Sequence, residues 1–408
     1  MDWDILFVGK LFPKEIETEI KSKMKTGMQE AANALQWNII NGLDANNCGK
    51  IQILDYLPID SYPNGYTDKY IKEYAFQHTD KYRSDDKVVG CTNITIIKQF
   101  VNVIPLKKEV NIWLQRSNLR KKIVIIYTAS SMFLELCKYV KKIDNDIITC
   151  CIIADIPEFL SARKLRGIEK AFNYYETQKS ALLYKYIDKY VLLTEHMSQK
   201  LSITAPYIVM EGIATDINIP YDKTLANRYA YEKCIIYTGT LNYQFGIMNL
   251  LTAFSKINSP NIKLIICGYG QAEEMILKKQ KEDNRIIFLG KLDREKTLSL
   301  QKAATVLVNP RQNNEEFTKY SFPSKTMEYL VSGVPVVAYK LDGIPDEYDE
   351  YLNYVEENTP EALAKKLIQI CDMSQQERTE MGRRGREFVL NNKNAVVQTQ
   401  KILELIKG

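Results

Sequence analysis

A serine, a lysine and a glutamate in the second half of the chain have types and spacing suited to a phosphorylated ligand. Ser324, Lys325 and Glu328 lie in a segment with helical spacing that opens near residues 321–324 and stops at Gly333. The free N–H groups of a helix start attract anions, and a lysine adds positive charge. Glu328 lies one turn after Ser324, where its carboxylate could accept hydrogen bonds from the hydroxyls of an adjoining sugar. In the alternative reading, Ser321 or Ser324 only caps the helix and Lys325 pairs with Glu328 at the surface.

Glycines end three apolar runs that precede this segment. They are Gly239, followed by Thr240, then Gly268, and then Gly290, preceded by Leu289. A missing side chain lets the backbone at a strand end approach a ligand. Residues 268–270 do not form a dinucleotide-binding fingerprint, because Glu273 occupies the position of the third glycine. A nicotinamide-dependent oxidoreductase is therefore disfavoured.

Short apolar runs alternate with amphipathic segments along the whole chain. The expected strands are 4–8, 123–128, 148–153, 190–193 and 208–210 in the first half, and 234–238, 263–267, 285–289, 304–308 and 334–338 in the second. Intervening segments such as 248–256, 272–282 and 294–302 have helical spacing. Continuous apolar strands followed by helices are typical of parallel sheets covered on both faces. We therefore predict an α/β protein with two doubly wound, Rossmann-like domains facing a central cleft, where such folds bind ligands.

The pattern restarts after residues 218–220, so we place the domain junction between about 212 and 232. We expect an N-terminal domain at residues 1–215, a C-terminal domain at 216–385, and a last helix at 386–408 that could pack back on the first domain.

Composition excludes several classes of protein. The 408 residues include 55 Lys and Arg against 50 Asp and Glu, a net charge of +5 that disfavours a nucleic-acid partner. The N-terminus lacks the features of a signal peptide and no apolar run is long enough to cross a bilayer, so we expect a cytoplasmic protein. Eight cysteines without a CxxC pair, together with two histidines, predict neither disulfides nor a metal site.

Five motifs in order resemble one known family. The set YTGTL…FGI, ICGYG, RIIFLG, VLVNPR and FPSKTMEYLVSGVPVV, between Cys234 and Tyr339, is similar to the donor-binding half of glycosyltransferase family 4. Members of that family are retaining enzymes of the GT-B fold that use nucleotide sugars. The first half resembles it more weakly, in residues 9–12, 36–43 and 155–157.

The resemblance implies roles for the residues at the strand ends and the helix start. Glu328, which matches the second glutamate of the family, would hold the donor ribose. Ser324 and Lys325 would face the diphosphate. The turn at Gly239 and Thr240 would lie beneath that diphosphate.

Other edges would complete the donor site. Gly268, with Leu289 and Gly290, would border the base, for which uridine is our expectation. Gly9, on the first glycine-containing loop, would approach the donor from the opposite domain. The donor would be a nucleotide diphosphate sugar, with no metal or other cofactor.

The chain also departs from the family pattern. Thr240 and Phe245 occupy the neighbourhoods of the family's usual arginine and lysine, so neutralising the leaving diphosphate would fall to Arg311 and Lys325. The first glutamate of the family would fall on Tyr320, and Glu316 is the preferred substitute over Glu315 in the same loop.

Asp155 is the candidate catalytic residue in the first half. It follows an expected buried strand and could orient the acceptor or the donor sugar. Ala154 precedes it, where the family often has a histidine. The alternative is that Asp155 caps a turn before Pro157.

We therefore expect a retaining hexosyltransferase that acts on a saccharide or lipid-linked acceptor in surface polysaccharide synthesis. Basic and aromatic residues in 14–28 and 163–189 would suit peripheral contact with the inner face of the membrane, or would only form solvated helix faces. Two other functions stay open, a non-catalytic nucleotide-sugar-binding protein and a sugar-nucleotide epimerase or hydrolase of the same fold.

Overall fold

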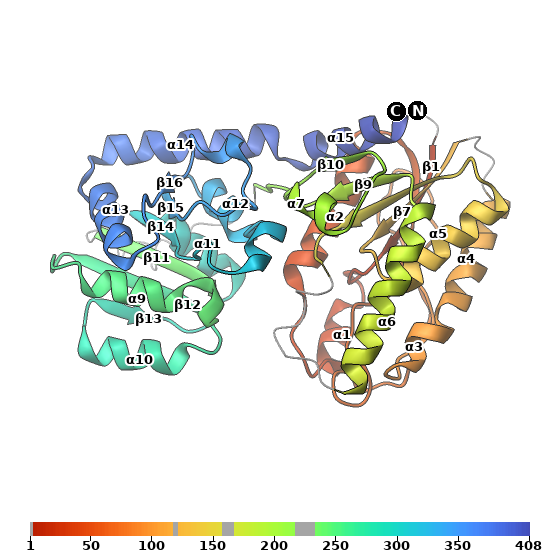
Figure 1. Cartoon of the computed structure of the whole chain (residues 1–408), viewed down its shortest axis with the longest axis horizontal. Coiled ribbons are helices and arrows are strands. Elements are labelled where there is room, and N and C mark those ends of the chain that lie inside the picture. Colours follow the sequence, from red (N-terminus) through yellow and green to blue (C-terminus); the bar gives the residue numbers. More distant parts are fainter. Residues whose placement is uncertain (1–2, 117–120, 157–166, 217–232) are drawn as a thin grey trace. The chain divides into compact units, whose positions relative to one another are not determined.

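The chain folds into two compact units (Figure 1). The computed structural model describes residues 3–116, 121–156, 167–216 and 233–408. Unit 1 comprises Met1–Ile213 together with Ala395–Gly408, and unit 2 comprises Ala214–Asn394. Each unit has its own apolar core around its own sheet.

Unit 1 contains a sheet in the order β10-β9-β8-β7-β1-β2-β5-β4. Its strands are β1 (Trp3–Gly9), β2 (Gly49–Asp55), β4 (Tyr74–Phe76), β5 (Asp86–Val88), β7 (Lys121–Tyr127), β8 (Ile148–Ile153), β9 (Lys189–Leu192) and β10 (Tyr207–Val209). Neighbouring strands are parallel except for β4, which is antiparallel to β5. A small antiparallel pair joins β3 (Tyr70–Ile71) to β6 (Cys91–Thr92).

The helices of unit 1 follow the strands as crossover connections. They are α1 (Glu17–Lys23), α2 (Glu30–Ala45), α3 (Ile97–Val101), α4 (Val103–Arg116), α5 (Ser131–Ile143), α6 (Ile168–Leu183), the short η2 (Tyr184–Tyr186) and α7 (His196–Lys200). The apolar runs of β1 and β7 are buried on both faces, as expected for a parallel sheet between helical layers.

The last helix of the chain, α15 (Ala395–Lys407), packs on α2 within unit 1. A Cβ added at Gly42 of α2 would lie 2.4 Å from the Ala395 carbonyl oxygen, so only glycine permits this close approach. Asn46 Nδ2 donates to Thr399 Oγ1 at 2.8 Å. The preceding helix α14 (Gln375–Asn392) ends in the asparagine-rich run 391–394, where residues of low helix propensity favour a break.

Unit 2 contains a sheet of parallel strands in the order β13-β12-β11-β14-β15-β16. They are β11 (Lys233–Thr240), β12 (Ile262–Tyr269), β13 (Ile286–Phe288), β14 (Val306–Asn309), β15 (Val336–Ala338) and β16 (Asn353–Tyr354). The helices are α9 (Ile247–Ser255), α10 (Glu273–Glu282), α11 (Arg294–Lys302), α12 (Ser324–Val331), α13 (Pro360–Asp372) and α14, with short turns η3 (Tyr243–Phe245), η4 (Glu316–Tyr320) and η5 (Asp346–Tyr348). The prediction of two parallel-sheet α/β domains is thus confirmed.

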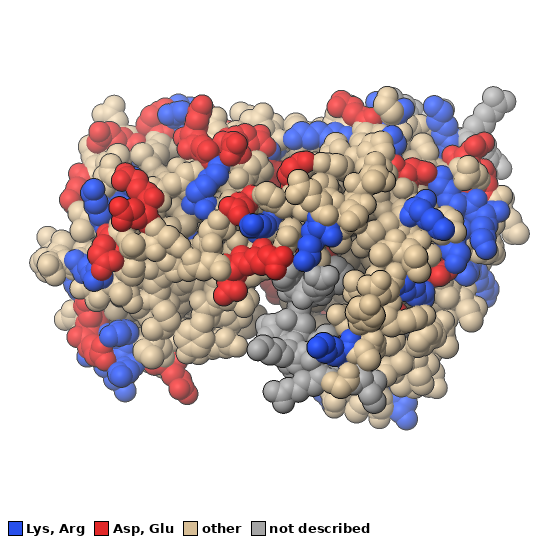
Figure 2. All heavy atoms as spheres, in the orientation of Figure 1, with Lys and Arg blue, Asp and Glu red and all other residues tan. Residues whose placement is uncertain are grey.

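Acidic and basic side chains are interspersed over the visible face of unit 2, whereas basic side chains gather over α4 and α5 of unit 1 (Figure 2). Within the described residues, no helix is both long and apolar enough to cross a membrane.

A buried histidine side chain connects strand β5, near one edge of the unit 1 sheet, to helix α2. His78 Nδ1 lies 2.6 Å from Asp86 Oδ2, and His78 Nε2 lies 3.3 Å from Asp44 Oδ2 at the end of α2. Burial alone would lower the pKa of His78, but its interactions with Asp44 and Asp86 raise that pKa to about 9. An imidazolium between two carboxylates therefore ties β5 to α2.

Replacing this histidine should reduce stability in a pH-dependent manner. Because the pKa of His78 is higher in the folded than in the unfolded chain, its contribution is complete below about pH 6.5 and is lost as the pH rises through about 9. His78→Gln should lower the free energy of unfolding by on the order of 3 kcal/mol at pH 6. Urea unfolding at pH 6 and pH 9.5 would measure this, and an equal loss at both values would contradict the charged state of His78.

Candidate functional site

Three glycine-containing strand ends form one edge of the unit 2 sheet. Gly239 of β11 is in register with Gly268 of β12, and Gly268 N–H donates to the Gly290 carbonyl at 2.8 Å. All three have positive φ, at 124°, 148° and 66°. The Leu289 N–H donates to the Ile266 carbonyl, which fixes the adjoining edge. The strand ends thus present backbone rather than side chains.

Lys325 lies directly against this edge. A Cβ added at Gly239 would be 1.9 Å from Lys325 Cε, so the glycine makes room for the lysine stem. Lys325 Nζ donates to the Tyr237 hydroxyl at 3.0 Å and lies 4.7 Å from the centre of that ring. Burial lowers the pKa of Lys325 to about 8, with nearby Arg311 lowering it further and Glu328 opposing this.

Arg311 follows β14 and is enclosed by aromatic rings. Only 6% of its surface is exposed, and its guanidinium lies 4.2 Å from the Phe317 ring centre and 5.7 Å from that of Phe245. Arg311 Nη2 donates to Ser321 Oγ at 2.8 Å, while Nε is buried without a hydrogen-bond partner among the described residues. Burial lowers the pKa of Arg311 to about 10.

Arg311 and Lys325 form no ion pair with any described carboxylate. Arg311 is buried and Lys325 is half-buried, and the charge of Arg311 lowers the pKa of Lys325. Two positive charges held close together away from water destabilise the folded protein unless an anion neutralises them. Two cations arranged in this way can bind a doubly charged anion.

The start of α12 points the same way. Ser324 is the first helical residue, and Pro323 at the N-cap has no side-chain group that could cap the helix. Ser324 is exposed and does not act as the cap, contrary to the structural alternative for this residue. The helix start can therefore attract an anion beside Lys325.

Glu328 is held from the far side by two residues of α11. Gln301 Nε2 donates to Glu328 Oε1 at 2.6 Å, and Arg294 Nη1 lies 3.7 Å from Oε2. Gln301 Nε2 also donates to Thr238 Oγ1, which ties the carboxylate to β11. The surface pair Lys325–Glu328 is not formed, and Glu328 is partly exposed.

Glu316 lies apart from these groups. It is the first residue of η4 and is exposed, and the Tyr320 hydroxyl donates to its carboxylate at 3.4 Å. The same short helix carries Phe317, which stacks on Arg311. The structure thus places Glu316 on the element that covers Arg311.

The two unit 1 candidates lie at the carboxyl ends of different strands. Gly9 ends β1, and Asp155 follows β8, with β7 between the two strands. The Asp155 side chain is exposed, yet the apolar strand end around it raises its pKa to about 6 by desolvation. These two residues belong to unit 1, whereas Arg311, Lys325 and the start of α12 belong to unit 2.

Several residues of the candidate site were not predicted from the sequence. Tyr237 and Phe317 flank the two cations, and Gln301 and Arg294 position Glu328. Gln301 is fully buried. A buried polar side chain needs a hydrogen-bond partner and so points to a polar site, but the sequence does not reveal this burial. Within the described residues, no group of three metal-ligating side chains is present.

Comparisons with known proteins point to one family. The family model described as glycosyl transferases group 1 matches residues 226–388. Two uncharacterized glycosyltransferases of Methanocaldococcus jannaschii are 22% identical over 258 residues and 28% identical over 188 residues. These matches cover 57% and 43% of this chain, and they span 62% and 44% of the two relatives.

Solved structures of the same fold match the whole chain. Sucrose-phosphate synthase from Thermosynechococcus elongatus has a TM-score of 0.65 at 14% identity, covering 99% of this chain and 98% of that one. HepE from Anabaena, in complex with UDP, has a TM-score of 0.64 at 15% identity and covers 99% of both chains. At these identities the likeness shows the fold alone.

Proposed function

We propose that this chain, whose residues 226–388 match the family model described as glycosyl transferases group 1, is a glycosyltransferase that transfers a hexose from a UDP-sugar to a saccharide or lipid-linked acceptor with retention of configuration. The matched segment, together with the two glycosyltransferases of Methanocaldococcus jannaschii that resemble the chain, supports this activity. The observation that supports the donor assignment is the pair Arg311 and Lys325, one buried and one half-buried cation without a carboxylate ion pair among the described residues.

These cations would bind the diphosphate of the donor. When the bond between the sugar anomeric carbon and the diphosphate breaks, its electron pair stays on the phosphate oxygen and adds negative charge there. Fixed cations in a water-poor site stabilise that charge without reorganising. Ser324 at the start of α12 would supply backbone N–H groups to the same phosphates, and the Gly239–Thr240 turn would lie beneath them.

The other strand ends and the glutamate would bind the nucleoside. Gly268 is buried, and Leu289 and Gly290 are half-buried; their backbone would border a base, as the motif resemblance implies. Glu328, already oriented by Gln301, would accept hydrogen bonds from the two ribose hydroxyls. Anabaena HepE was solved with UDP and with UDP-glucose, which supports uridine as the base.

Unit 1 would supply the acceptor side, with Gly9 approaching the donor. Asp155, whose pKa of about 6 lets it either accept or hold a proton near neutral pH, would orient the acceptor hydroxyl or the donor sugar. Glu316 would contact the transferred sugar in place of the first glutamate of the family.

Peripheral contact with the inner face of the membrane is also part of the proposal. On α6, Tyr174, Tyr175 and Leu182 are exposed, which suits insertion among lipid headgroups. The lysines of α1 are less suited, because Lys21 and Lys23 form ion pairs with Glu17 and Glu19. Arg163, Lys164 and Arg166 lie outside the described residues.

Replacing Glu328 tests the donor site. UDP at 100 times its dissociation constant should stabilise the wild-type protein by about 2.7 kcal/mol and raise its melting temperature selectively over GDP, ADP, dTDP and CMP. Glu328→Gln should weaken UDP binding by about 10-fold or more, because a charge-assisted hydrogen bond to the ribose is lost. Thermal shift and isothermal titration calorimetry would measure this.

Glu295→Gln, an exposed glutamate on the same helix as Arg294, is the matched control and should bind UDP normally. No response to any of the five nucleotides would refute the donor assignment. Nucleotide binding without transfer across a broad donor and acceptor panel would favour a binding protein. Donor consumption without an acceptor would favour an epimerase or hydrolase.

A further inference from the structure

The loop that follows β1 in unit 1 is held by side chains rather than by secondary structure. The backbone N–H groups of residues 10–12 donate to the side chains of Gln36 (2.7 Å), Asp55 (2.7 Å) and Asn33 (2.9 Å). Gln36 Nε2 in turn donates to the Lys10 carbonyl at 2.6 Å. With its backbone groups satisfied in this way, the loop has a defined conformation and presents the Lys10 side chain from a fixed base.

The Lys10 ammonium group has no acidic partner among the described residues. Its Nζ lies 5.4 Å from the centre of the Phe133 ring, and no described carboxylate lies within ion-pair distance. Burial, and then the charge of Lys98 on α3, lower the pKa of Lys10 to about 8. Lys98 is close enough to act on Lys10 electrostatically, so unit 1 holds a second pair of neighbouring cations.

The positive charge of Lys98 is only partly offset by its neighbours. Its Nζ donates to the Ile59 carbonyl at 3.4 Å, and Asp60 offsets some of the effect of burial, which lowers the pKa of Lys98. The recorded neighbours of the two ammonium groups are an aromatic ring for Lys10 and a backbone carbonyl for Lys98, and neither neutralises a full positive charge.

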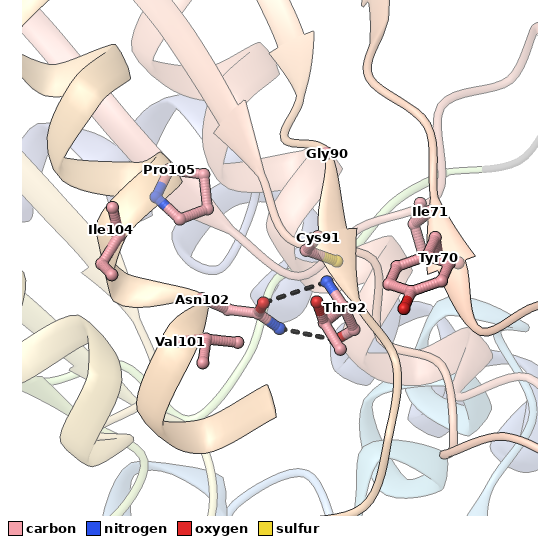
Figure 3. Close-up of a pocket in the computed structure, with 9 residues that line it drawn as sticks. All are labelled: Tyr70, Ile71, Gly90, Cys91, Thr92, Val101, Asn102, Ile104 and Pro105. Atoms are coloured by element: carbon pink, nitrogen blue, oxygen red, sulfur yellow. Dashed lines mark hydrogen bonds between the residues drawn. The ribbon is translucent and has the colours of Figure 1, made fainter. Parts of the chain in front are cut away.

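A pocket of about 380 Å³ lies beside α3 (Figure 3). Asn102, which lines it, donates its backbone N–H to the Lys98 carbonyl at 3.3 Å and its side-chain amide to the Tyr56 hydroxyl at 2.8 Å. The Tyr56 ring meets the edge of Phe133, the ring beside Lys10, so contacts connect the pocket to both lysines. Asn102 fixes one wall by bonding to the backbone of Thr92 on both sides, at 3.0 and 2.7 Å. Much of the remaining lining is apolar, and Ile104 at its rim is 67% exposed.

We propose that Lys10 and Lys98 bind the phosphate group of a phosphorylated acceptor, with the neighbouring pocket receiving the apolar group that the phosphate carries. This inference rests on the proposed function, because it assigns the substrate of the acceptor side. Unit 2 has its own cation pair for the donor diphosphate, so a second pair in unit 1 matches a second anionic substrate. A dianionic phosphate balances two lysines.

The test uses full-length protein saturated with UDP. Two phosphate-bearing probes are compared with their neutral counterparts by thermal shift: glucose 6-phosphate against methyl glucoside, and undecaprenyl diphosphate-linked N-acetylglucosamine in detergent against octyl glucoside. At least one phosphate-bearing probe should stabilise the wild type, whereas its neutral counterpart should not. Stabilisation by the lipid-linked probe alone assigns the phosphate to a lipid carrier, and stabilisation by glucose 6-phosphate assigns it to a soluble sugar.

Variants separate this site from the fold and from the donor site. Lys10→Met should weaken binding of the phosphate-bearing probe by about 10-fold or more while leaving the UDP response unchanged, and Lys10→Arg should restore most of it. Lys50→Met is the matched control, because Lys50 is exposed near the amino end of β2, at the opposite edge of the same sheet.

Three results would overturn the inference: no stabilisation by either phosphate-bearing probe, unchanged probe binding in Lys10→Met, or loss of the UDP response in that variant, which would place Lys10 on the donor. A missing UDP response in the wild type with the phosphate response intact would refute the donor site and leave this site standing.

Discussion

Arg311→Met should lower kcat by about 10²- to 10³-fold, while the free energy of unfolding should rise or stay unchanged. The guanidinium is buried between Phe317 and Phe245, and its Nε has no hydrogen-bond partner among the described residues. A methionine of similar length can occupy the same aromatic slot. Removing an uncompensated buried charge relieves a desolvation cost in the free protein, so the loss should fall on the leaving diphosphate alone.

Lys325→Met should behave in the same manner, and the two effects should not add. The groups are close enough for Arg311 to lower the pKa of Lys325, and they would act on one phosphate chain, so the double variant should lose less than the product of the single losses. Initial rates of UDP-sugar turnover at saturating donor would measure this.

Lys319→Met, on the exposed face of η4 next to the site, is the matched control and should retain activity. Unchanged turnover in Arg311→Met and Lys325→Met would remove both residues from the leaving-group role. A large fall in stability for either variant would show that the cation is a structural element with a partner that neutralises it.

Much of unit 2 could be predicted from the sequence because its information is local. The runs at 234–238 and 263–267 are apolar and rich in isoleucine, and they became β11 and β12 with only a few residues added at each end. Arg294–Lys302 was predicted as a helix with the bounds that it has in α11. Gly333 has the left-handed φ of 76° expected of a residue that ends a helix.

Contacts between segments far apart in the sequence could not be predicted from it. The Lys325–Tyr237 hydrogen bond joins residues 88 positions apart, and Gln301 reaches Glu328 across 27. Strand β2 was missed because Lys50 and Gln52 interrupt its isoleucines, and a search for continuous apolar runs passes over that pattern. Because β2 was missed, the role of Asp55 at its end was missed as well, and with it the hydrogen bond that anchors the loop carrying Lys10.

Gly268→Ala should destabilise unit 2 by about 3 kcal/mol or more. Its φ of 148° is rare for residues with a side chain, and an added Cβ would lie 1.8 Å from the Gly239 carbonyl oxygen. The backbone cannot move aside as a flexible side chain can, so β11 and β12 would have to separate at the ends that we propose to border the nucleotide. The variant should therefore lose UDP binding together with stability.

Gly290→Ala is the comparison that separates the effect of a steric clash from the effect of a positive φ. Gly290 also has a positive φ, at 66°, but an added Cβ would meet nothing within 4 Å. This variant should cost only about 1 kcal/mol, the strain of a left-handed residue. Urea unfolding and UDP titration of both variants would measure the difference. Equal losses would show that backbone strain alone governs this edge, whereas a collapse confined to Gly268→Ala would show that the strand ends must touch for the donor site to exist.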